Sequence, residues 1–186
     1  MGVGQMENSE FLNIILRDGT SQSEAFAFYD QLDIVEPEEM IGMWKGEEIV
    51  TGHPLEGLLA ASGWYGKEFI DEEHVHPLVF KKSNGVLYTI SPSLLPLNFL
   101  LQSMQNIPKQ ILSPSMTILR PLLNTNKSAA RLRKVKHRGK VTSAMIYDNK
   151  GIIDIFRKID ENTLLGIMDI KEQSSDKTFF FILRKA

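Results

Sequence analysis

Hydrophobic residues follow three different patterns along the chain, and these patterns divide it into segments. Residues 8–35 place apolar side chains at helical spacing. Residues 38–91 and 128–186 instead contain short runs in which apolar and polar residues alternate, as they do in half-buried strands. Residues 91–123 form an apolar stretch that prolines interrupt repeatedly. The pattern predicts an α+β protein that is mainly antiparallel β, with about nine strands.

Local signals set the ends of the predicted helices. A first helix is expected over residues 10–18, which Asn8 or Ser9 can cap and Gly19 ends. Ser21 and Glu24 have the spacing of a capping box, which predicts that a second helix begins there. A third helix is expected over residues 54–62, because a proline stands at its first position and Gly63 follows its last.

We expect one compact domain that is built from four consecutive parts. They are an N-terminal helical segment (1–37), a region with the first barrel strands and one helix (38–91), a helical, proline-punctuated insertion or lid (92–127) and a five-strand antiparallel meander (128–186). The sequence shows no internal repeat and no low-complexity linker between them. Because antiparallel strands can curl until the first meets the last, the strands can close into a barrel.

A tryptophan between two glycines marks the first predicted strand. Side chains alternate between the two faces of a strand, so Gly42, Trp44 and Gly46 point the same way. Without a Cβ on either side of it, the indole can lie along its own strand, or another segment can cross close above it. Two interpretations remain: Trp44 closes one end of a core, or it forms an aromatic wall of a ligand pocket.

Several motifs resemble known families. The chain contains Gly42-x-Trp44-x-Gly46 and later Gly63-Trp64-Tyr65-Gly66-Lys67, which are similar to the GXWXG domain. Near the C-terminus, Ala144-Met145-Ile146-Tyr147-Asp148 and Gly166-x-Met168-Asp169 resemble the domain of unknown function that accompanies it. The resemblance implies a lipocalin-like (calycin-type) β-barrel and no settled activity. A further analogy to lipocalins implies that Arg184, late in the last strand, packs its cation over the Trp44 indole.

The expected turns allow one face of the C-terminal meander to be derived. A turn at 148–151 with a glycine bulge sets Met145 opposite Ile155, and a tight turn at 160–163 sets Ile155 opposite Met168. We expect the resulting, mainly apolar face to point into the barrel. Its members are Val141, Ser143, Met145, Tyr147, Ile153, Ile155, Arg157, Ile159, Leu164, Gly166, Met168 and Ile170. The opposite face, which carries Asp154, is expected to be solvated or covered by a helix.

Arg157 is then a cation on an apolar wall, and a buried guanidinium needs an anion. Two partners are open: a carboxylate from another strand or helix, or the head group of an anionic lipophile such as a fatty acid. In the second case Ser143 and the Tyr147 hydroxyl add hydrogen bonds. The remaining expected pocket residues are Trp44, Trp64, Met145, Ile155 and Met168.

Composition narrows the function without naming it. The net charge is −2 and cysteine is absent, which gives no basic field for nucleic acid and removes disulfides, thiolate chemistry and cysteine metal sites. His74 and His76 could share a strand face, but a solvated acidic loop explains them better than a metal site. The N-terminus lacks signal-peptide features, so a cytoplasmic location is expected. We expect no cofactor, no metal and no nucleic-acid partner, while the oligomeric state and transient membrane contact stay open.

The sequence shows no nucleophile–base pair, phosphate loop or cofactor fingerprint. The first hypothesis is therefore a protein that binds a small hydrophobic or amphipathic molecule inside the barrel. The alternative is an enzyme, of isomerase or hydrolase type, that uses the same cavity with His53, Asp154 or Tyr147 as acid or base. A third hypothesis is a protein-interaction module that uses residues 91–123.

Overall fold

A computed structural model describes residues 3–94, 124–171 and 176–186. Most of the predicted insertion at 92–127 lies outside the described residues, as does most of the interaction surface considered for 91–123. The helices are α1 (Val3–Asp18), α2 (Gln22–Gln31), η1 (Pro37–Met40), α3 (Leu58–Ser62) and η2 (Pro92–Leu94). The strands are β1 (Gly42–Ile49), β2 (Trp64–Phe69), β3 (Val75–Lys81), β4 (Leu87–Thr89), β5 (Ala130–His137), β6 (Lys140–Tyr147), β7 (Ile152–Asp160), β8 (Thr163–Ile170) and β9 (Phe179–Lys185).

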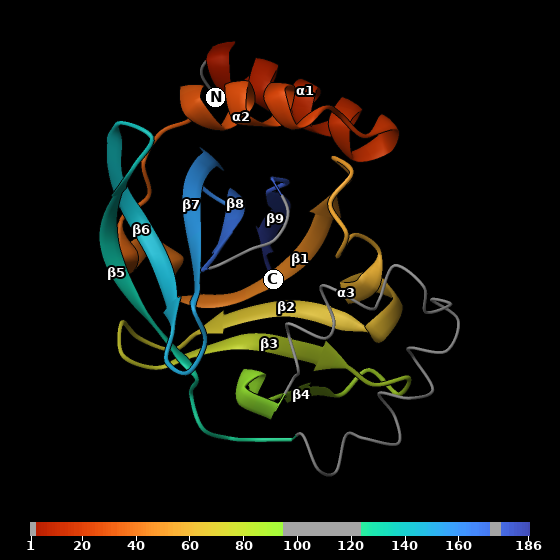
Figure 1. Ribbon diagram of the computed structural model, residues 1–186, viewed down its shortest axis with the longest axis vertical. Helices are drawn as coiled ribbons and strands as arrows, with labels where there is room; N and C mark the ends of the chain where they lie inside the picture. Colours follow the sequence, from red (N-terminus) through yellow and green to blue (C-terminus); the bar gives the residue numbers. More distant parts are fainter. Residues whose placement is uncertain (1–2, 95–123, 172–175) are drawn as a thin grey trace.

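Eight of these strands close into an antiparallel barrel. Around the barrel the order is β1, β9, β8, β7, β6, β5, β3 and β2, and β2 pairs again with β1. β4 extends β3 outside the closed ring. Figure 1 shows β1, β2 and β3 crossing the lower half of the barrel and β5 to β9 completing it. The predicted fold class is therefore confirmed, and β5 to β9 are the predicted five-strand meander.

Helices α1 and α2 lie side by side across one side of the barrel (Figure 1). An apolar cluster fills the space between these helices and the outer face of the barrel. It includes Leu12, Ile15, Phe28, Tyr29, Ile155, Ile159, Leu165, Ile167, Phe180 and Ile182. The predicted capping box is present at the start of α2, where the Ser21 hydroxyl accepts from the Glu24 amide at 3.2 Å. No described helix is long and apolar enough to cross a membrane.

The predicted register of β7 is wrong by one residue. Met145 lies opposite Asp154, and Phe156 lies opposite Gly166. On the β6 side, the observed register extends to residue 147 opposite residue 152. The four residues between these positions therefore connect the strands without the expected bulge. On the β8 side, the tight turn forms as predicted, but an irregularity between Lys158 and Asp160 shifts the pairs beyond it.

A shift of one residue turns every side chain of a strand to the opposite face. Asp154 and Phe156 therefore point into the barrel, whereas Ile153, Ile155, Arg157 and Ile159 point outward, beneath the helices. An apolar cluster fills the barrel interior, and Met145, Tyr147, Leu164, Met168 and Ile170 lie in or against this interior cluster as expected. Val141 does not, since it is 48% exposed. The prediction that Asp154 is solvated or lies under a helix is also wrong, since its side chain is fully buried inside the barrel.

Candidate functional site in the barrel interior

Different segments close the two ends of the barrel interior. At one end Trp44 is fully buried, and its indole Nε1 donates to the carbonyl oxygen of Met40 in η1 at 2.6 Å. At the other end, Leu55 and Leu58 pack into the same apolar cluster next to Phe179, the first residue of β9. The position of Trp44 favours the interpretation in which this residue closes one end of the core.

Gly46, the second glycine of the Gly-x-Trp-x-Gly motif, makes room for a second tryptophan, and Gly66 on β2 allows a close backbone approach. A Cβ on Gly46 would lie 2.0 Å from the Trp64 ring, so Gly46 leaves the space that this indole occupies. Gly66 is the register partner of Lys45, and a Cβ on it would lie 1.9 Å from the Trp44 carbonyl oxygen. These glycines therefore let β1 and β2 approach closely where the two tryptophans enter the interior.

The cation over the Trp44 indole is Lys185, not Arg184. The Lys185 ammonium lies 5.6 Å from the ring centroid, and Lys185 is the register partner of Trp44 on β9. Arg184 instead pairs with Lys45, whose side chain is exposed on the outer face of β1. The prediction drawn from the lipocalin analogy is thus wrong by one residue, although a cation–π contact does form at this place.

A lysine–aspartate pair spans the barrel interior from opposite walls. Lys67 stands on β2 and Asp154 on β7, and these strands are four positions apart in either direction around the ring. The Lys67 Nζ lies 2.8 Å from Asp154 Oδ2, and the two side chains are 3% and 0% exposed. Such a pair is shielded from solvent, so removal of one partner would leave the other as an uncompensated buried charge.

Aromatic rings surround the Lys67 ammonium. Its nitrogen lies 5.1 Å from the ring centroid of Phe181, 5.7 Å from that of Trp64 and 5.8 Å from that of Tyr147. It also donates to the carbonyl oxygen of Pro77 at 3.3 Å. The centre of the barrel therefore combines one ion pair with apolar walls, and we call Lys67, Asp154, Tyr147 and Trp64 the polar centre.

The polar centre carries hydrogen-bonding atoms that are not fully used. Apart from the ion pair, neither carboxylate oxygen of Asp154 accepts a well-aligned hydrogen bond from the described residues, and none of these residues supplies an acceptor for the Trp64 Nε1. Burial raises the pKa of Asp154, while the Lys67 ammonium and the Tyr147 hydroxyl act in the opposite direction. Burial and the Asp154 charge together raise the pKa of Tyr147 well above its ordinary value. The centre thus offers donors and acceptors in an apolar surrounding.

The Glu48 carboxylate fastens α3 over the end of the barrel that Leu55 and Leu58 close. Glu48 lies on the inward side of β1 and accepts hydrogen bonds from the backbone N–H groups of Gly57, Leu59 and Ala60. Burial raises its pKa, and these hydrogen bonds oppose the rise. A single carboxylate therefore holds the first turn of this helix onto the barrel wall.

His53 lies near this end of the barrel and not with Asp154. Its Nδ1 accepts from the Leu55 amide at 3.1 Å, and its ring packs edge-on against Phe179. Burial lowers its pKa and therefore favours the neutral ring. The acid–base candidates that do meet in the interior are Asp154 and Tyr147.

The other expected site residues separate into two groups. Tyr147, Met145, Trp44, Trp64 and Met168 lie in or against the interior cluster. Ser143 is buried as well, and its hydroxyl donates to the Val35 carbonyl oxygen at 2.8 Å. Arg157 and Ile155 lie on the outer face of the barrel, so the prediction that they line the interior is wrong; the cause is the shifted register of β7.

The sequence did contain a signal for the internal Lys67–Asp154 pair, which the prediction missed although Asp154 was an acid–base candidate. On β2, Lys67 shares its face with Phe69, and on β7, Asp154 lies between Ile152 and Phe156 at alternate positions. A charged residue with apolar neighbours two positions away stands on an inward face. Two such residues of opposite charge would have suggested an internal ion pair.

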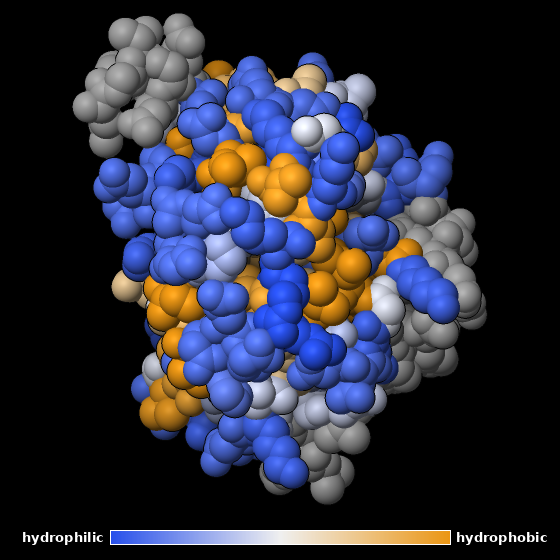
Figure 2. All heavy atoms as spheres, turned by 90° about the vertical axis from the view of Figure 1, so that its left-hand side faces the viewer, coloured by the Kyte–Doolittle hydropathy of each residue, from blue (hydrophilic) through white to orange (hydrophobic). Residues whose placement is uncertain are grey.

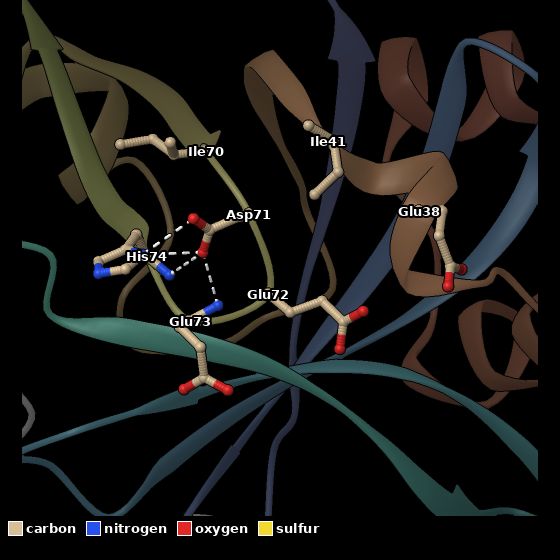
Figure 3. Close-up of a pocket in the computed structure, with 7 residues that line it drawn as sticks. All are labelled: Glu38, Ile41, Ile70, Asp71, Glu72, Glu73 and His74. Carbon is tan, nitrogen blue, oxygen red and sulfur yellow. Dashed lines mark hydrogen bonds and ion pairs between the residues drawn. The ribbon is translucent and has the colours of Figure 1, made fainter.

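A separate pocket opens at the surface near the loop between β2 and β3. Its volume is about 410 Å³, and its lining residues are Glu38, Ile41, Ile70, Asp71, Glu72, Glu73 and His74. Figure 3 shows that the Asp71 carboxylate is already held by His74 and by the backbone N–H of Glu73. No group of three or more histidine, cysteine or acidic residues that could bind a metal occurs in the described parts of the chain.

The fold and its interior define a closed, lipocalin-like antiparallel barrel with a charged pair across its lumen. Residues 27–85 match the family model of the GXWXG protein, and residues 128–185 match that of the domain of unknown function DUF4334. Both resemblances that the motifs suggested are therefore confirmed.

One solved structure is similar over nearly the whole chain. It is the crystal structure of a protein from Thermomonospora curvata, with a TM-score of 0.70 and 28% sequence identity. The similarity covers 97% of this chain and 99% of that one. Among curated proteins, none matches.

Proposed function

We propose that the protein binds a small, mainly apolar molecule inside the barrel and holds one polar group of it at the polar centre. The observation that carries this proposal is the Asp154 carboxylate, which is fully buried and, within the part of the chain that the structure describes, accepts no well-aligned hydrogen bond beyond its ion pair. The unpaired N–H of Trp64 lies on an aromatic ring that also faces the Lys67 ammonium. Buried polar groups normally have partners, so unused ones beside each other indicate a place for a ligand group.

The geometry limits the size and the head group of such a ligand. An eight-stranded barrel is only wide enough for its own side chains or for one small molecule. The Lys67–Asp154 pair crosses this interior, so a long chain cannot pass through while the pair is intact. The head group that suits the centre both accepts from an N–H and donates to a carboxylate. A hydroxyl or an un-ionised carboxylic acid has these properties.

Fluorescent probes test this proposal. 1-Aminoanthracene is a small neutral probe, and dansylated undecanoic acid is an anionic, fatty-acid-like one. We expect the wild-type protein to bind at least one of them saturably, and we expect Lys67→Met/Asp154→Leu to weaken that binding at least tenfold while remaining folded. The matched control is Lys45→Met, which removes an exposed lysine of β1. Equal binding by all three proteins, or no binding by the wild type, would contradict the proposal.

An enzyme that acts on a similar molecule is the second candidate. It is favoured by one observation, the meeting of the Asp154 carboxyl and the Tyr147 hydroxyl inside an apolar interior, where the pKa of Asp154 is raised. A buried carboxyl of this kind is suited to act as general acid or base. Deuterium exchange next to the carbonyl of 2-decanone in heavy water measures this chemistry. Exchange that is faster with the wild type than with Asp154→Asn would favour catalysis, and equal rates would speak against it.

A further inference from the structure

Arg157 is a buried cation that lies outside the barrel, beneath α2. The residue is 0% exposed, and its guanidinium carbon lies 5.0 Å from the centroid of the Tyr29 ring. Its Nη2 donates to the carbonyl oxygen of His137, at the end of β5, at 2.9 Å. The group is therefore enclosed by one helix, the β5–β6 hairpin and its own strand.

The charge of Arg157 has no counter-ion among the described residues. Its Nε and Nη1 have no acceptor, and the neighbouring Nδ1 of His137 is buried without a partner as well. Asp30 is close enough that Arg157 contributes to the lowering of its pKa, but its carboxylate forms two 2.6 Å hydrogen bonds with Arg138. Tyr29 does not supply the missing negative charge, because its hydroxyl keeps its proton and donates it to the Ile155 carbonyl oxygen. Lys67, the other deeply buried cation, has a carboxylate at 2.8 Å.

A buried guanidinium without an anion costs several kcal/mol, so a stable fold is expected to supply one. The cation–π contact with Tyr29 offsets only part of this cost. Of the charged groups that act on His137, Arg157 and Arg138 are positive and Asp30 and Asp169 are negative. Asp30 is held by Arg138, and among the described residues no carboxylate, Asp169 included, forms an ion pair with Arg157. The unused Nε and Nη1 donors of this buried guanidinium therefore call for one monovalent anion in direct contact with it.

We propose that Arg157 and His137 bind a small inorganic anion of the size of chloride, between α2 and the outer face of β7. The anion is small because Arg157 and Tyr29 are both fully buried. It can enter at the β5–β6 hairpin, where His137 is only half-buried and the turn at Arg138 is exposed. Figure 2 looks onto the side of the molecule that this hairpin forms, where hydrophilic side chains cover much of the surface. This site is separate from the polar centre and does not depend on the function proposed for it.

Thermal unfolding in chloride tests the proposal. Sodium chloride replaces sodium gluconate, whose anion is too large for this place, at constant ionic strength, so that only the anion changes. We expect the wild-type Tm to rise by about 5–10 °C when chloride exceeds its Kd about a hundredfold. Arg157→Met should fold, because apolar side chains of similar volume replace buried charges without loss, and its Tm should not respond to chloride. Arg131→Met, which removes an exposed arginine, should respond like the wild type.

A second measurement uses only the wild-type protein. Crystals soaked in bromide should show an anomalous peak beside the Arg157 guanidinium, within hydrogen-bonding reach of Nε or Nη1. A chloride response that Arg157→Met retains would overturn the proposal, because the stabilising anion would then bind elsewhere. The absence of a bromide peak at Arg157 would also overturn it, whether or not the variant folds.

Discussion

The Lys67–Asp154 pair makes the most specific prediction about stability. Lys67→Met removes the ammonium and leaves a fully buried carboxylate, while Asp154→Leu leaves a buried ammonium. Breaking a buried pair in this way costs about 3–5 kcal/mol, whereas replacing both partners by apolar residues is often neutral or stabilising. Because the side chains are 3% and 0% exposed, solvent screening does not reduce these values much.

We therefore expect each single variant to lose about 3–5 kcal/mol and the double variant to lose less than about 2 kcal/mol. The remaining loss in the double variant reflects the buried Tyr147 hydroxyl, which no longer lies near a carboxylate. Typical domains have a free energy of unfolding of about 5–15 kcal/mol, so either single variant is substantially destabilised. The two losses cannot be additive, because both arise from the same interaction.

Urea unfolding, followed by tryptophan fluorescence and extrapolated linearly, measures these free energies. The control is Lys45→Met, an exposed lysine on the same sheet, for which a change within about 0.5 kcal/mol is expected. The reasoning would be refuted if each single variant lost less than about 1 kcal/mol, or if the double variant lost the sum of the two.

The pH dependence of Lys67→Met has a defined sign. Burial raises the folded-state pKa of Asp154, and the Lys67 ammonium opposes the rise, so removing Lys67 raises this pKa further. A carboxyl whose pKa is higher in the folded chain than in the unfolded chain favours folding when it is protonated. The stability lost in Lys67→Met should therefore be largest above the folded-state pKa of Asp154 and should diminish as the pH falls through it. A loss that stays constant or grows on acidification would contradict this account.

Three further predictions concern single contacts. Gly46→Ala places a Cβ in the space of the Trp64 ring and should cost about 1–3 kcal/mol and shift the tryptophan emission, whereas an unchanged spectrum would contradict the contact. Glu48→Gln weakens the carboxylate hydrogen bonds to the start of α3, so amide exchange of Leu59 should accelerate more than that of β9. Ser21→Ala removes the cap of α2 and should cost about 1 kcal/mol in urea unfolding, and no measurable loss would contradict it.

Sequence patterns predicted the fold well because alternation and turn residues are local. The five strands of the meander, the capping box at Ser21 and the left-handed glycine after α3 are all present. The start of α1 was predicted later in the chain than Val3, where it begins. The start of α3 was predicted earlier than Leu58, where it begins, so local signals located these helices more reliably than they located their first residues.

The candidate site could not be predicted as well, because it depends on register between strands. An irregularity between Lys158 and Asp160 on one side of β7, and a connection without a bulge on the other, each shift the strand by one residue. No residue type in the sequence requires either feature. The shift exchanges Arg157 for Asp154 on the inward face, and the chemistry of the interior changes with it.

Native mass spectrometry of the wild-type protein, purified from several expression hosts, tests the central claim most directly. We expect a stoichiometric small-molecule adduct on the wild type, or one formed on adding 1-aminoanthracene, that Lys67→Met/Asp154→Leu loses and Lys45→Met retains. A folded wild-type protein that carries no adduct from any host and forms none with the probe would contradict the claim that the barrel interior is a binding site.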